Sequence, residues 1–441
     1  MCGIAGFISN NKEYKGKKIV SEMLKIMHYR GPNQCGLKTF DDATLGMVRL
    51  SIIDQNSHDI PYEDRTQRYA IVYNGEIYNH DSIKNSLSHK YKFKTVSDAE
   101  TALYNYIEKG EKSFTDYNGM YAFAIYDSLN KEVYIVRDKS GEKPLYYTSG
   151  KDFFAFSSEI KCLLKIVKPE LNEPALSYRA YEFNVGSETL FKYIYALEPG
   201  EFIKIKNGKF TKHKYWKVWD NLIDIKDDEG KILKDLAELV EDSILLRTKN
   251  CVHKFGCFIS GGVDSSLVAC IAKPNFIYTA HYDYEDFNEL EYAKMVAKKI
   301  KRKLVIVKPT KDDFLRTRDK IAFHLDTPCT WTSFSLWVLL ERAIRDLRVI
   351  LSGEGADEIF AGYHRYHLLY HDEQIHNLEA MKNYTYLIER YYGSPIERYA
   401  KLVNRCENQF DVNVKQYLEE NISFFFDKMF FILFSNCVCN S

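Results

Sequence analysis

The chain has 441 residues, of which 45% are hydrophobic and 28% are charged; these values are typical of globular proteins and exclude a largely disordered chain. Lys and Arg number 61, as do Asp and Glu, so the net charge is zero and the basic excess of a general nucleic-acid binder is absent. At about 150 residues per domain, this length predicts two or three domains.

The first ~210 residues are predicted to form short strands separated by turns, with few helices. Residues 70–73 are a strand candidate, and the Asn74-Gly75 dipeptide after it predicts a tight turn because it favours positive φ. Strands at 121–126 and 132–136 predict a hairpin. Together these elements indicate a layered sheet domain.

Two helices are expected in this half, near residues 17–28 and 98–109. The second is preceded by Ser97, which can cap its N-terminus, and Glu100 stands where it would complete a capping box.

From about residue 228 the pattern changes to strands alternating with helices, which predicts a parallel sheet covered on both faces. The expected strands are 255–259, 276–282, 304–307 and 349–351, and the expected helices are 231–246, 267–272, 290–300 and 336–346. The predicted organisation is a first domain over 1–216, a linker over 217–227, a second domain over 228–367 and a divergent C-terminal region over 368–441.

The ten cysteines are scattered and show no C-x-x-C pair, which favours reduced thiols in a cytoplasmic protein over a zinc or redox site. The N-terminus has no signal-peptide pattern. The apolar segment 424–434 is shorter than the ~18 residues that cross a bilayer, and charges interrupt it, so no membrane partner is expected.

Cys2 follows the initiator methionine and has a small side chain, so removal of Met1 is expected. Cys2 would then carry both a thiol and a free α-amine, which can act through water as the base for its own nucleophile. Alone, a cysteine at this position indicates little, and an ordinary thiol at the start of a strand would explain it.

An ordered series of motifs accompanies Cys2 and resembles the glutaminase domain of glutamine-dependent asparagine synthetases, an N-terminal-nucleophile fold of the αββα sandwich type. The resemblance covers nearly all of residues 1–216, with Asn33 as a departure where the family usually has Asp. The motifs are Met1-Cys2-Gly3-Ile4-Ala5-Gly6, Arg30-Gly31-Pro32, Arg49-Leu50-Ser51-Ile52-Ile53-Asp54, Tyr73-Asn74-Gly75-Glu76-Ile77-Tyr78-Asn79, Ser97-Asp98-Ala99-Glu100, Asn118-Gly119-Met120-Tyr121-Ala122-Phe123, Arg137-Asp138, Gly141-Glu142-Lys143-Pro144-Leu145-Tyr146-Tyr147 and Ser158-Glu159-Ile160-Lys161.

The resemblance implies that Cys2 attacks the amide carbon of glutamine, with Asn74 and the Gly75 backbone N–H as the oxyanion hole. Arg49 would bind the substrate α-carboxylate through its guanidinium fork. Independently of any family, the α-carbon of glutamine needs one cationic contact and at least one anionic contact. The resemblance places the remaining glutamine contacts at Leu50, Ser51, Ile52 and Ile53 and, for the α-ammonium, at Glu76 and Asp98.

The second constellation follows strand 255–259, where Ser260-Gly261-Gly262-Val263-Asp264-Ser265-Ser266 leads into a helix. Glycines and hydroxyls at a strand-to-helix turn expose backbone N–H groups and form an anion site. The Gly-Lys-Ser/Thr ending of a Walker loop is missing, which disfavours γ-phosphate transfer. The segment resembles instead the pyrophosphate loop of ATP pyrophosphatases, and Asp264 could hold Mg²⁺ on the phosphates.

A second signature of the same family is Ser352-Gly353-Glu354-Gly355-Ala356-Asp357. The resemblance implies that Ser352 and Gly353 contact ATP, that Glu354 supports the adenylation step and that Asp357 is a metal ligand. It also implies that the backbones of Phe258 and Tyr282 bind adenine. The implied ATP contacts are Phe258, Ser260, Gly261, Gly262, Asp264, Ser265, Ser266, Tyr282, Ser352 and Gly353.

These motifs predict a glutamine-hydrolysing ligase that makes asparagine from aspartate, with ATP as substrate, Mg²⁺ as cofactor and β-aspartyl-AMP as intermediate. Nucleic-acid partners are not expected, and a homodimer stays open. The resemblance ends near Tyr366, so two alternatives remain: a shortened relative that only hydrolyses glutamine, and a silent ligand-binding protein.

Overall fold

The computed structural model describes residues 1–52, 54, 60–178, 186–223, 228–249, 251, 253–283 and 289–363. The predicted region 368–441, the candidate residue Ile53 and the end of the predicted linker lie outside the described residues. The described residues group into two compact units. The first comprises Met1–Pro169, Tyr193–Leu222 and the described residues of 228–353.

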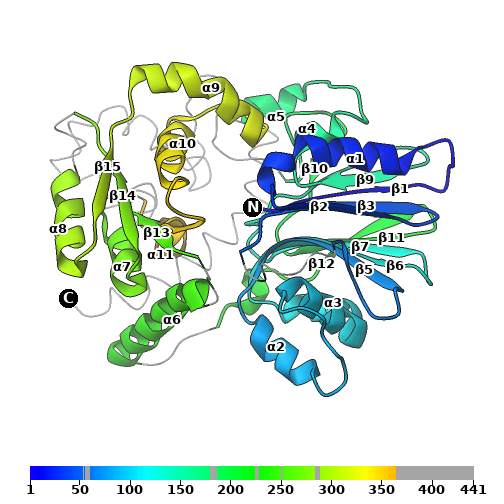
Figure 1. Cartoon of the computed structure of the whole chain (residues 1–441), viewed down its shortest axis with the longest axis horizontal. Helices are drawn as coiled ribbons and strands as arrows, with labels where there is room; N and C mark the ends of the chain where they lie inside the picture. Colours follow the sequence, from blue (N-terminus) through cyan, green and yellow to red (C-terminus); the bar gives the residue numbers. More distant parts are fainter. Residues whose placement is uncertain are drawn as a thin grey trace, which may run out of the picture. The chain divides into compact units, whose positions relative to one another are not determined.

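The N-terminal half is a sandwich of two antiparallel sheets (Figure 1). Each has six strands among the described residues, and their order in the sheet differs from their order in the sequence. The first sheet has the order β10-β8-β9-β1-β3-β2 and the second β12-β11-β7-β6-β5-β4. The strands are β1 (Gly3–Ile8), β2 (Gln34–Thr39), β3 (Ala43–Arg49), β4 (Tyr62–Glu63), β5 (Tyr69–Ile77), β6 (Gly119–Asp127), β7 (Glu132–Arg137), β8 (Tyr146–Ser149), β9 (Phe154–Ser157), β10 (Tyr195–Ala196), β11 (Glu201–Lys206) and β12 (Lys209–Lys214).

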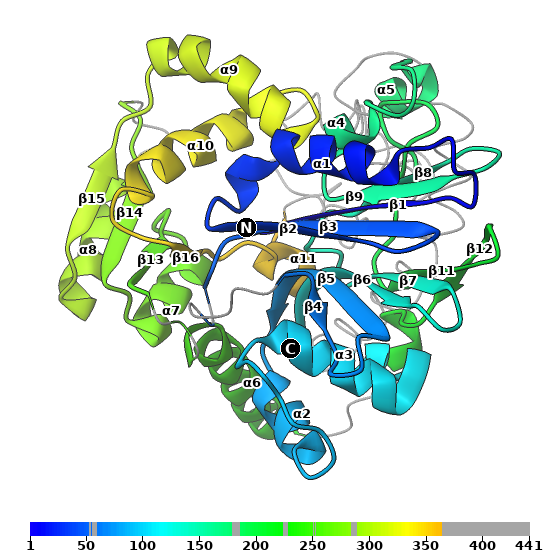
Figure 2. The same cartoon turned by 45° about the vertical axis from the view of Figure 1, so that its right-hand side comes forward.

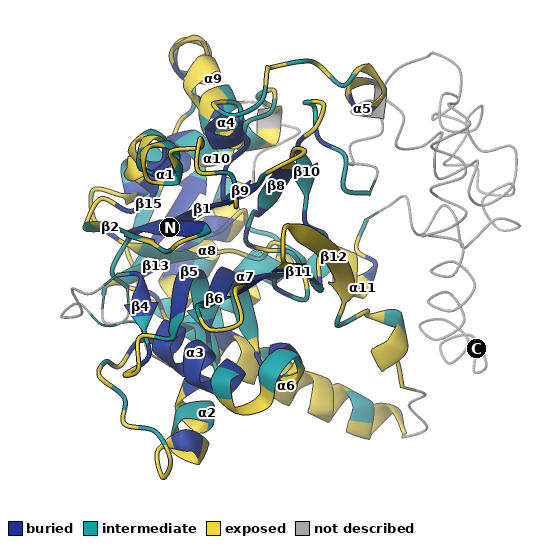
Figure 3. Ribbon diagram, turned by 90° about the vertical axis from the view of Figure 1, so that its right-hand side faces the viewer, coloured by how far each residue is buried: buried dark blue, intermediate teal, exposed yellow. Residues whose placement is uncertain are grey.

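Helices cover both outer faces of this sandwich: α1 packs on β1 and β3, and α3 packs on β5. Every residue of β1 and β3 is buried, as Figure 3 shows, while β12 at the edge is exposed. The helices are α1 (Gly16–Ile26), α2 (His80–Leu87), α3 (Asp98–Lys109) and α4 (Ile160–Leu163), with 3₁₀ turns at His28–Arg30, Gly110–Thr115 and Trp219–Asn221; α5 (Glu173–Tyr178) belongs to the second unit. The predicted αββα fold is therefore confirmed.

The predicted tight turn at Asn74-Gly75 is wrong. Strand β5 continues through both residues, and neither has a positive φ. Asn74 pairs with Ala122 and Gly75 with Tyr121 on β6. A Cβ on Gly75 would lie 2.3 Å from the carbonyl oxygen of Met120, so the glycine serves close strand pairing and not a turn.

The helix predicted at 98–109 is confirmed, but its capping box is wrong. The Ser97 hydroxyl accepts from the Ala99 N–H at 3.2 Å, as an N-cap should. The Glu100 carboxylate accepts instead from the N–H groups of Lys94 and Thr95, at 2.8 and 2.7 Å. Glu100 therefore secures the loop before the helix, because two unpaired donors there compete with the single N–H of Ser97.

The C-terminal half contains the predicted parallel sheet, with the order β15-β14-β13-β16 (Figure 2). Helices α7 and α8 contribute to the core on one face, and α10 to the core on the other. The strands are β13 (Phe255–Phe258), β14 (Phe276–Ala280), β15 (Leu304–Val307) and β16 (Val349–Leu351), and the helices are α6 (Glu229–Lys249), α7 (Val263–Ala272), α8 (Leu290–Ile300), α9 (Lys311–Leu325), α10 (Trp331–Ala343) and α11 (Ala356–Phe360).

Several element boundaries differ from expectation; helix α7, for example, begins at Val263 and not at residue 267. Strand β14 ends at Ala280, so Tyr282 lies beyond the strand in which it was predicted. Helix α10 starts five residues before the predicted position, because the Thr330 side chain caps it in a capping box with Ser333. No helix within the described ranges is long and apolar enough to cross a membrane.

Replacing Gly75 with Ala should lower the free energy of unfolding by about 3 kcal/mol, because the new methyl group overlaps backbone atoms of β6 that cannot rotate away. Thermal unfolding followed by circular dichroism measures the loss. Gly230→Ala is the matched control: it lies in helix α6 and would meet only the flexible Asp228 carboxylate, so it should be neutral or stabilising. Equal effects of both substitutions would contradict the close pairing of β5 and β6.

Candidate active site

Cys2 lies immediately before β1, which pairs with β3 and β9 in the middle of the first sheet. Its thiol lies beside Leu50, at 3.4 Å from the Leu50 nitrogen and 3.7 Å from the Leu50 oxygen. Burial raises the pKa of the Cys2 thiol, and the Leu50 backbone and Arg49 act in the opposite direction. A thiol with a raised pKa needs a base to form the nucleophilic thiolate.

Arg49 ends β3 with its side chain in the interior, 5% exposed. Its guanidinium donates to the Gln34 side chain at 3.0 Å and to the backbone oxygen of Asp54. The predicted contacts Leu50, Ser51 and Ile52 follow it directly, and the backbone oxygen of Ser51 lies 3.2 Å from the His253 ring. The guanidinium thus already shapes the loop that was expected to hold glutamine.

Asn74 is 1% exposed on β5, a strand that packs against β1. Its side-chain nitrogen Nδ2 is buried and has no hydrogen-bond partner within the part of the chain that the structure describes. An unpaired buried N–H donor is costly unless a ligand uses it. This is the property that an oxyanion hole requires, since its donors wait for charge that develops during reaction.

Asp98 is buried at the start of α3 and accepts three hydrogen bonds, from the Tyr73 hydroxyl at 2.6 Å and the N–H groups of Ile77 and Ala99 at 2.9 and 3.1 Å. Burial and the negative charge of Asp98 raise the pKa of Glu76 to about 8, while Lys143 lowers it. The buried carboxylate of Asp98 and the half-buried carboxylate of Glu76 therefore lack enough neighbouring positive charge, which suits them to bind an ammonium group.

Lys143 and Arg30 are residues to which the sequence assigned no role. Lys143 is buried, and burial lowers the pKa of its amine, with Glu142 and Glu76 opposing that shift. Arg30 donates from Nε to the Cys2 backbone oxygen at 2.9 Å. Both stand inside quoted motifs, but only the folded chain shows that these cations surround the N-terminus.

The loop after β13 is held by its own hydroxyl groups. Ser260 Oγ accepts from the Gly262 N–H at 3.1 Å, and the Ser265 hydroxyl accepts from the Ser260 N–H at 3.2 Å. Gly261 has φ +112°, a conformation that excludes other residues. The N-cap residue Gly262 supplies no side-chain acceptor to α7, so the first N–H groups of the helix, at Val263 and Asp264, are potential donors to an anion.

Strand β13 pairs in parallel with β14 on one side and with β16 on the other, so the chain reverses its direction of sheet growth at β13. Ligands of such sheets bind at the carboxyl ends of the strands beside this switch point. Gly353 follows β16 there, and a Cβ on it would lie 2.7 Å from the Ser265 nitrogen. Ser352 precedes it.

The remaining residues predicted for ATP binding and catalysis lie on other segments of the chain. Phe258 ends β13, and the Tyr282 hydroxyl lies 2.6 Å from the Ser335 Oγ, after the end of β14. Glu354 and Asp357 belong to the second unit, with Asp357 in the first turn of α11 and Glu354 exposed before it. Their roles stay predictions.

The oxygen ligands at the Ser260–Ser266 loop fit a magnesium ion that is coordinated mostly by substrate phosphates. In the described stretches no group of three His, Cys, Asp or Glu side chains could hold a metal alone. Asp264 supplies one carboxylate in the first turn of α7, and the neighbouring Ser266 hydroxyl is buried with no partner among the described residues. Mg²⁺ is commonly bound in this way, through one or two carboxylates together with substrate phosphates.

In the comparison with known proteins, two family models match successive parts of the chain. A family model described as a glutamine amidotransferase domain matches residues 1–216, and one described as asparagine synthase matches residues 235–424. The chain is 31% identical over 380 residues to asparagine synthetase [glutamine-hydrolyzing] 1 of Bacillus subtilis, covering 83% of this chain and 59% of the relative.

Two further relatives are covered more completely. The chain is 31% identical over 404 residues to putative asparagine synthetase [glutamine-hydrolyzing] 1 of Methanocaldococcus jannaschii, which covers 84% of this chain and 71% of that protein. It is 28% identical to asparagine synthetase B of Escherichia coli, covering 87% and 69%. The chain belongs to the family of glutamine-hydrolysing asparagine synthetases.

Proposed function

We propose that this chain makes asparagine from aspartate, using ATP and ammonia that it releases from glutamine. The observation that carries the glutaminase half concerns Asn74, on the strand that packs against β1. Its side-chain nitrogen Nδ2 is buried and has no hydrogen-bond partner in the described part of the chain, and β1 begins beside Cys2. The parallel sheet with its Ser260–Ser266 loop at the switch point supports the ATP half.

In the first half-reaction, the Cys2 thiolate attacks the amide carbon of glutamine and forms a C–S bond. The C–N bond then breaks, and the leaving nitrogen takes the proton that the base removed from the thiol, so that ammonia is released. Water then hydrolyses the thioester to glutamate. Once Met1 is removed, the α-amine of Cys2 would be the base that accepts the thiol proton, through water.

Glutamine would be oriented by the two opposite charges on its α-carbon. Arg49 binds the α-carboxylate, while Glu76 and Asp98 bind the α-ammonium. Asn74 Nδ2 and the Gly75 N–H stabilise the oxyanion, and the hydrogen bonds from Tyr73 and Ile77 fix the Asp98 carboxylate before substrate arrives.

In the second half-reaction, the aspartate β-carboxylate attacks the α-phosphorus of ATP and pyrophosphate leaves; ammonia then attacks the acyl carbon and AMP leaves. The Ser260–Ser266 loop and the Ser352-Gly353 pair bind the phosphates, with Glu354 supporting adenylation. Asp264 and Asp357 would hold Mg²⁺, which neutralises phosphate charge.

A second candidate is a protein that hydrolyses glutamine but completes no amide synthesis. The chain spans 59% of the length of its Bacillus relative. A ligand-binding protein without catalytic activity is the third candidate. That function does not explain why the buried Nδ2 of Asn74 has no hydrogen-bond partner among the described residues.

We further propose a cytoplasmic location, small-molecule substrates only and a homodimer as the assembly to test by light scattering. The seven described cysteines, Cys2, Cys35, Cys162, Cys251, Cys257, Cys270 and Cys329, all carry free thiols. Free thiols suit a reducing compartment.

A coupled measurement of glutamate, pyrophosphate and asparagine tests the function. The wild-type chain should form all three from glutamine, aspartate and ATP, and Cys2→Ala should lose glutamate release while keeping ammonia-driven asparagine synthesis. Pyrophosphate missing with both nitrogen donors would refute the synthetase half, and glutamine use by the variant would refute the nucleophile. Cys35→Ala, an exposed thiol, is the control and should leave all three products unchanged.

Asn74→Ala should lower kcat for glutamine hydrolysis by roughly 10²–10³-fold, because one oxyanion donor is lost. The melting temperature should hardly fall, since the removed amide nitrogen has no partner to abandon within the described structure. Steady-state kinetics and thermal unfolding check the two effects. A large loss of stability with intact kcat would indicate a structural role.

The KM for glutamine should fall as the pH rises from 6 to 8 and then level off. Glu76 is protonated below its raised pKa of about 8, whereas the α-ammonium of glutamine binds the charged carboxylate of Glu76. At lower pH, Glu76 must therefore lose a proton before glutamine binds. The slope is at most about tenfold per pH unit. Glu76→Gln should raise KM and flatten this profile; an unchanged profile in that variant would exclude Glu76 as the titrating group.

A further inference from the structure

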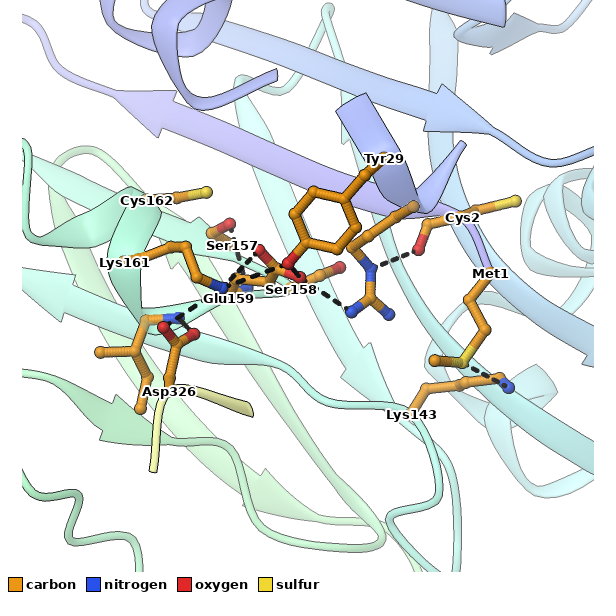
Figure 4. A network of polar contacts seen from close by, with 12 residues as sticks. Met1, Cys2, Tyr29, Lys143, Ser157, Ser158, Glu159, Lys161, Cys162 and Asp326 are labelled. Carbon is orange, nitrogen blue, oxygen red and sulfur yellow. Dashed lines mark hydrogen bonds and ion pairs between the residues drawn. The ribbon is translucent and has the colours of Figure 1, made fainter. Parts of the chain in front are cut away.

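A buried cluster of charges joins the sandwich to the parallel-sheet region within the first compact unit. We define it as the Glu159 joint, formed by Tyr29, Arg30, Glu159, Lys161 and Asp326. Figure 4 labels Tyr29, Glu159, Lys161 and Asp326. Glu159 is 2% exposed and accepts from Arg30 Nη1 at 3.0 Å, from Lys161 Nζ at 2.8 Å and from the Tyr29 hydroxyl. Neither half-reaction as derived above uses any of these side chains.

One end of the joint reaches the nucleophile. Arg30, which binds Glu159 through Nη1, also donates from Nε to the backbone oxygen of Cys2 at 2.9 Å. The position of the Cys2 backbone therefore depends on the guanidinium, and the orientation of the guanidinium depends on Glu159.

The other end reaches the connection between α9 and α10. Lys161 Nζ lies 3.2 Å from Asp326 Oδ1, and Asp326 Oδ2 accepts from the Ile160 N–H at 2.8 Å. Asp326 ends α9 in a left-handed conformation, φ 55°, five residues before the start of α10, which packs on β14. The Tyr29 ring meets His324 edge-on at 4.2 Å, and Lys161 lies over Phe323, so aromatic groups shield the joint.

The charges of the joint balance, with Arg30 and Lys161 against Glu159 and Asp326. Removing one partner from a buried set leaves a charge that must find a new neighbour. Without the Asp326 charge, Lys161 has only Glu159 left as a carboxylate partner in the joint, and it would compete there with Arg30. A change at the α9–α10 connection would in this way reach the Cys2 carbonyl.

We propose that the Glu159 joint is a positioning network that couples release of ammonia at Cys2 to its use at the parallel sheet, with Asp326 as the residue that links the two halves. This inference rests on the proposed function. Breaking the joint at Asp326 should leave each half-reaction running but allow glutamine to be hydrolysed without asparagine being made.

Asp326→Asn tests this with little change of shape, because asparagine accepts the left-handed conformation and keeps an oxygen for the Ile160 N–H. The full chain is assayed with glutamine and, separately, with ammonia. The ratio of glutamate to asparagine formed from glutamine should rise by about fivefold, the scale of coupling between linked sites. The rate with ammonia should stay within about twofold. A merely structural role would slow both donors alike and leave the ratio unchanged, which would overturn the proposal.

Asp319→Asn is the matched control, since Asp319 lies on the same helix, is exposed and pairs only locally with Arg318. Its ratio should equal that of the wild type, and a rise equal to that of Asp326→Asn would overturn the proposal. If Asp326→Asn does not fold, the charge-balanced double variant Lys161→Met/Asp326→Asn replaces it and must show the same raised ratio. A wild-type chain that releases no glutamate or pyrophosphate refutes the proposed function, whereas an unchanged ratio in an active variant refutes the joint alone.

Discussion

The candidate glutaminase site depends on the pairing of β1 between β3 and β9 inside a closed sandwich. Every residue of β1 is buried and pairs with β3, and Ala5–Ile8 also pair with β9, so the residue before the strand has little freedom to move. Cys2 is that residue. A chain end that would otherwise fray is thereby held beside Arg49, at the end of β3, and opposite β5, which supplies Asn74.

The same burial makes the charges of the site costly, and the structure compensates only part of that cost. Asp98 receives three hydrogen bonds, and Arg49 has acceptors on Gln34 and Asp54. Glu76 and Asn74 Nδ2 are left for a ligand, as the raised pKa of Glu76 and the absence of a partner for Nδ2 within the described residues show. A zwitterionic amide fits this set, since it brings an ammonium and an oxyanion to the two uncompensated positions.

The parallel sheet reaches its function by a different route, through backbone and not through buried charge. Its loop after β13 depends on Gly261 at φ +112° and on close approach of Gly353, positions where a side chain would collide. The small hydroxyls of Ser260 and Ser265 hold the turn open. Phosphate can therefore be met by N–H groups at the start of α7, without a Walker lysine.

The sequence by itself determined the helix at 98–109, the hairpin of β6 and β7 and the alternating second half, because these follow from local periodicity and nearby capping groups. The αββα fold class of the first half followed from the resemblance of its motifs to a known family. The sequence failed at Asn74-Gly75 and at Glu100, where a neighbouring strand and a neighbouring loop offered partners that local patterns do not contain. Only the tertiary structure brought Arg30, Glu159, Lys161 and Asp326 together, since they lie up to 296 residues apart (326 − 30) and their charges matter only once burial removes water from between them.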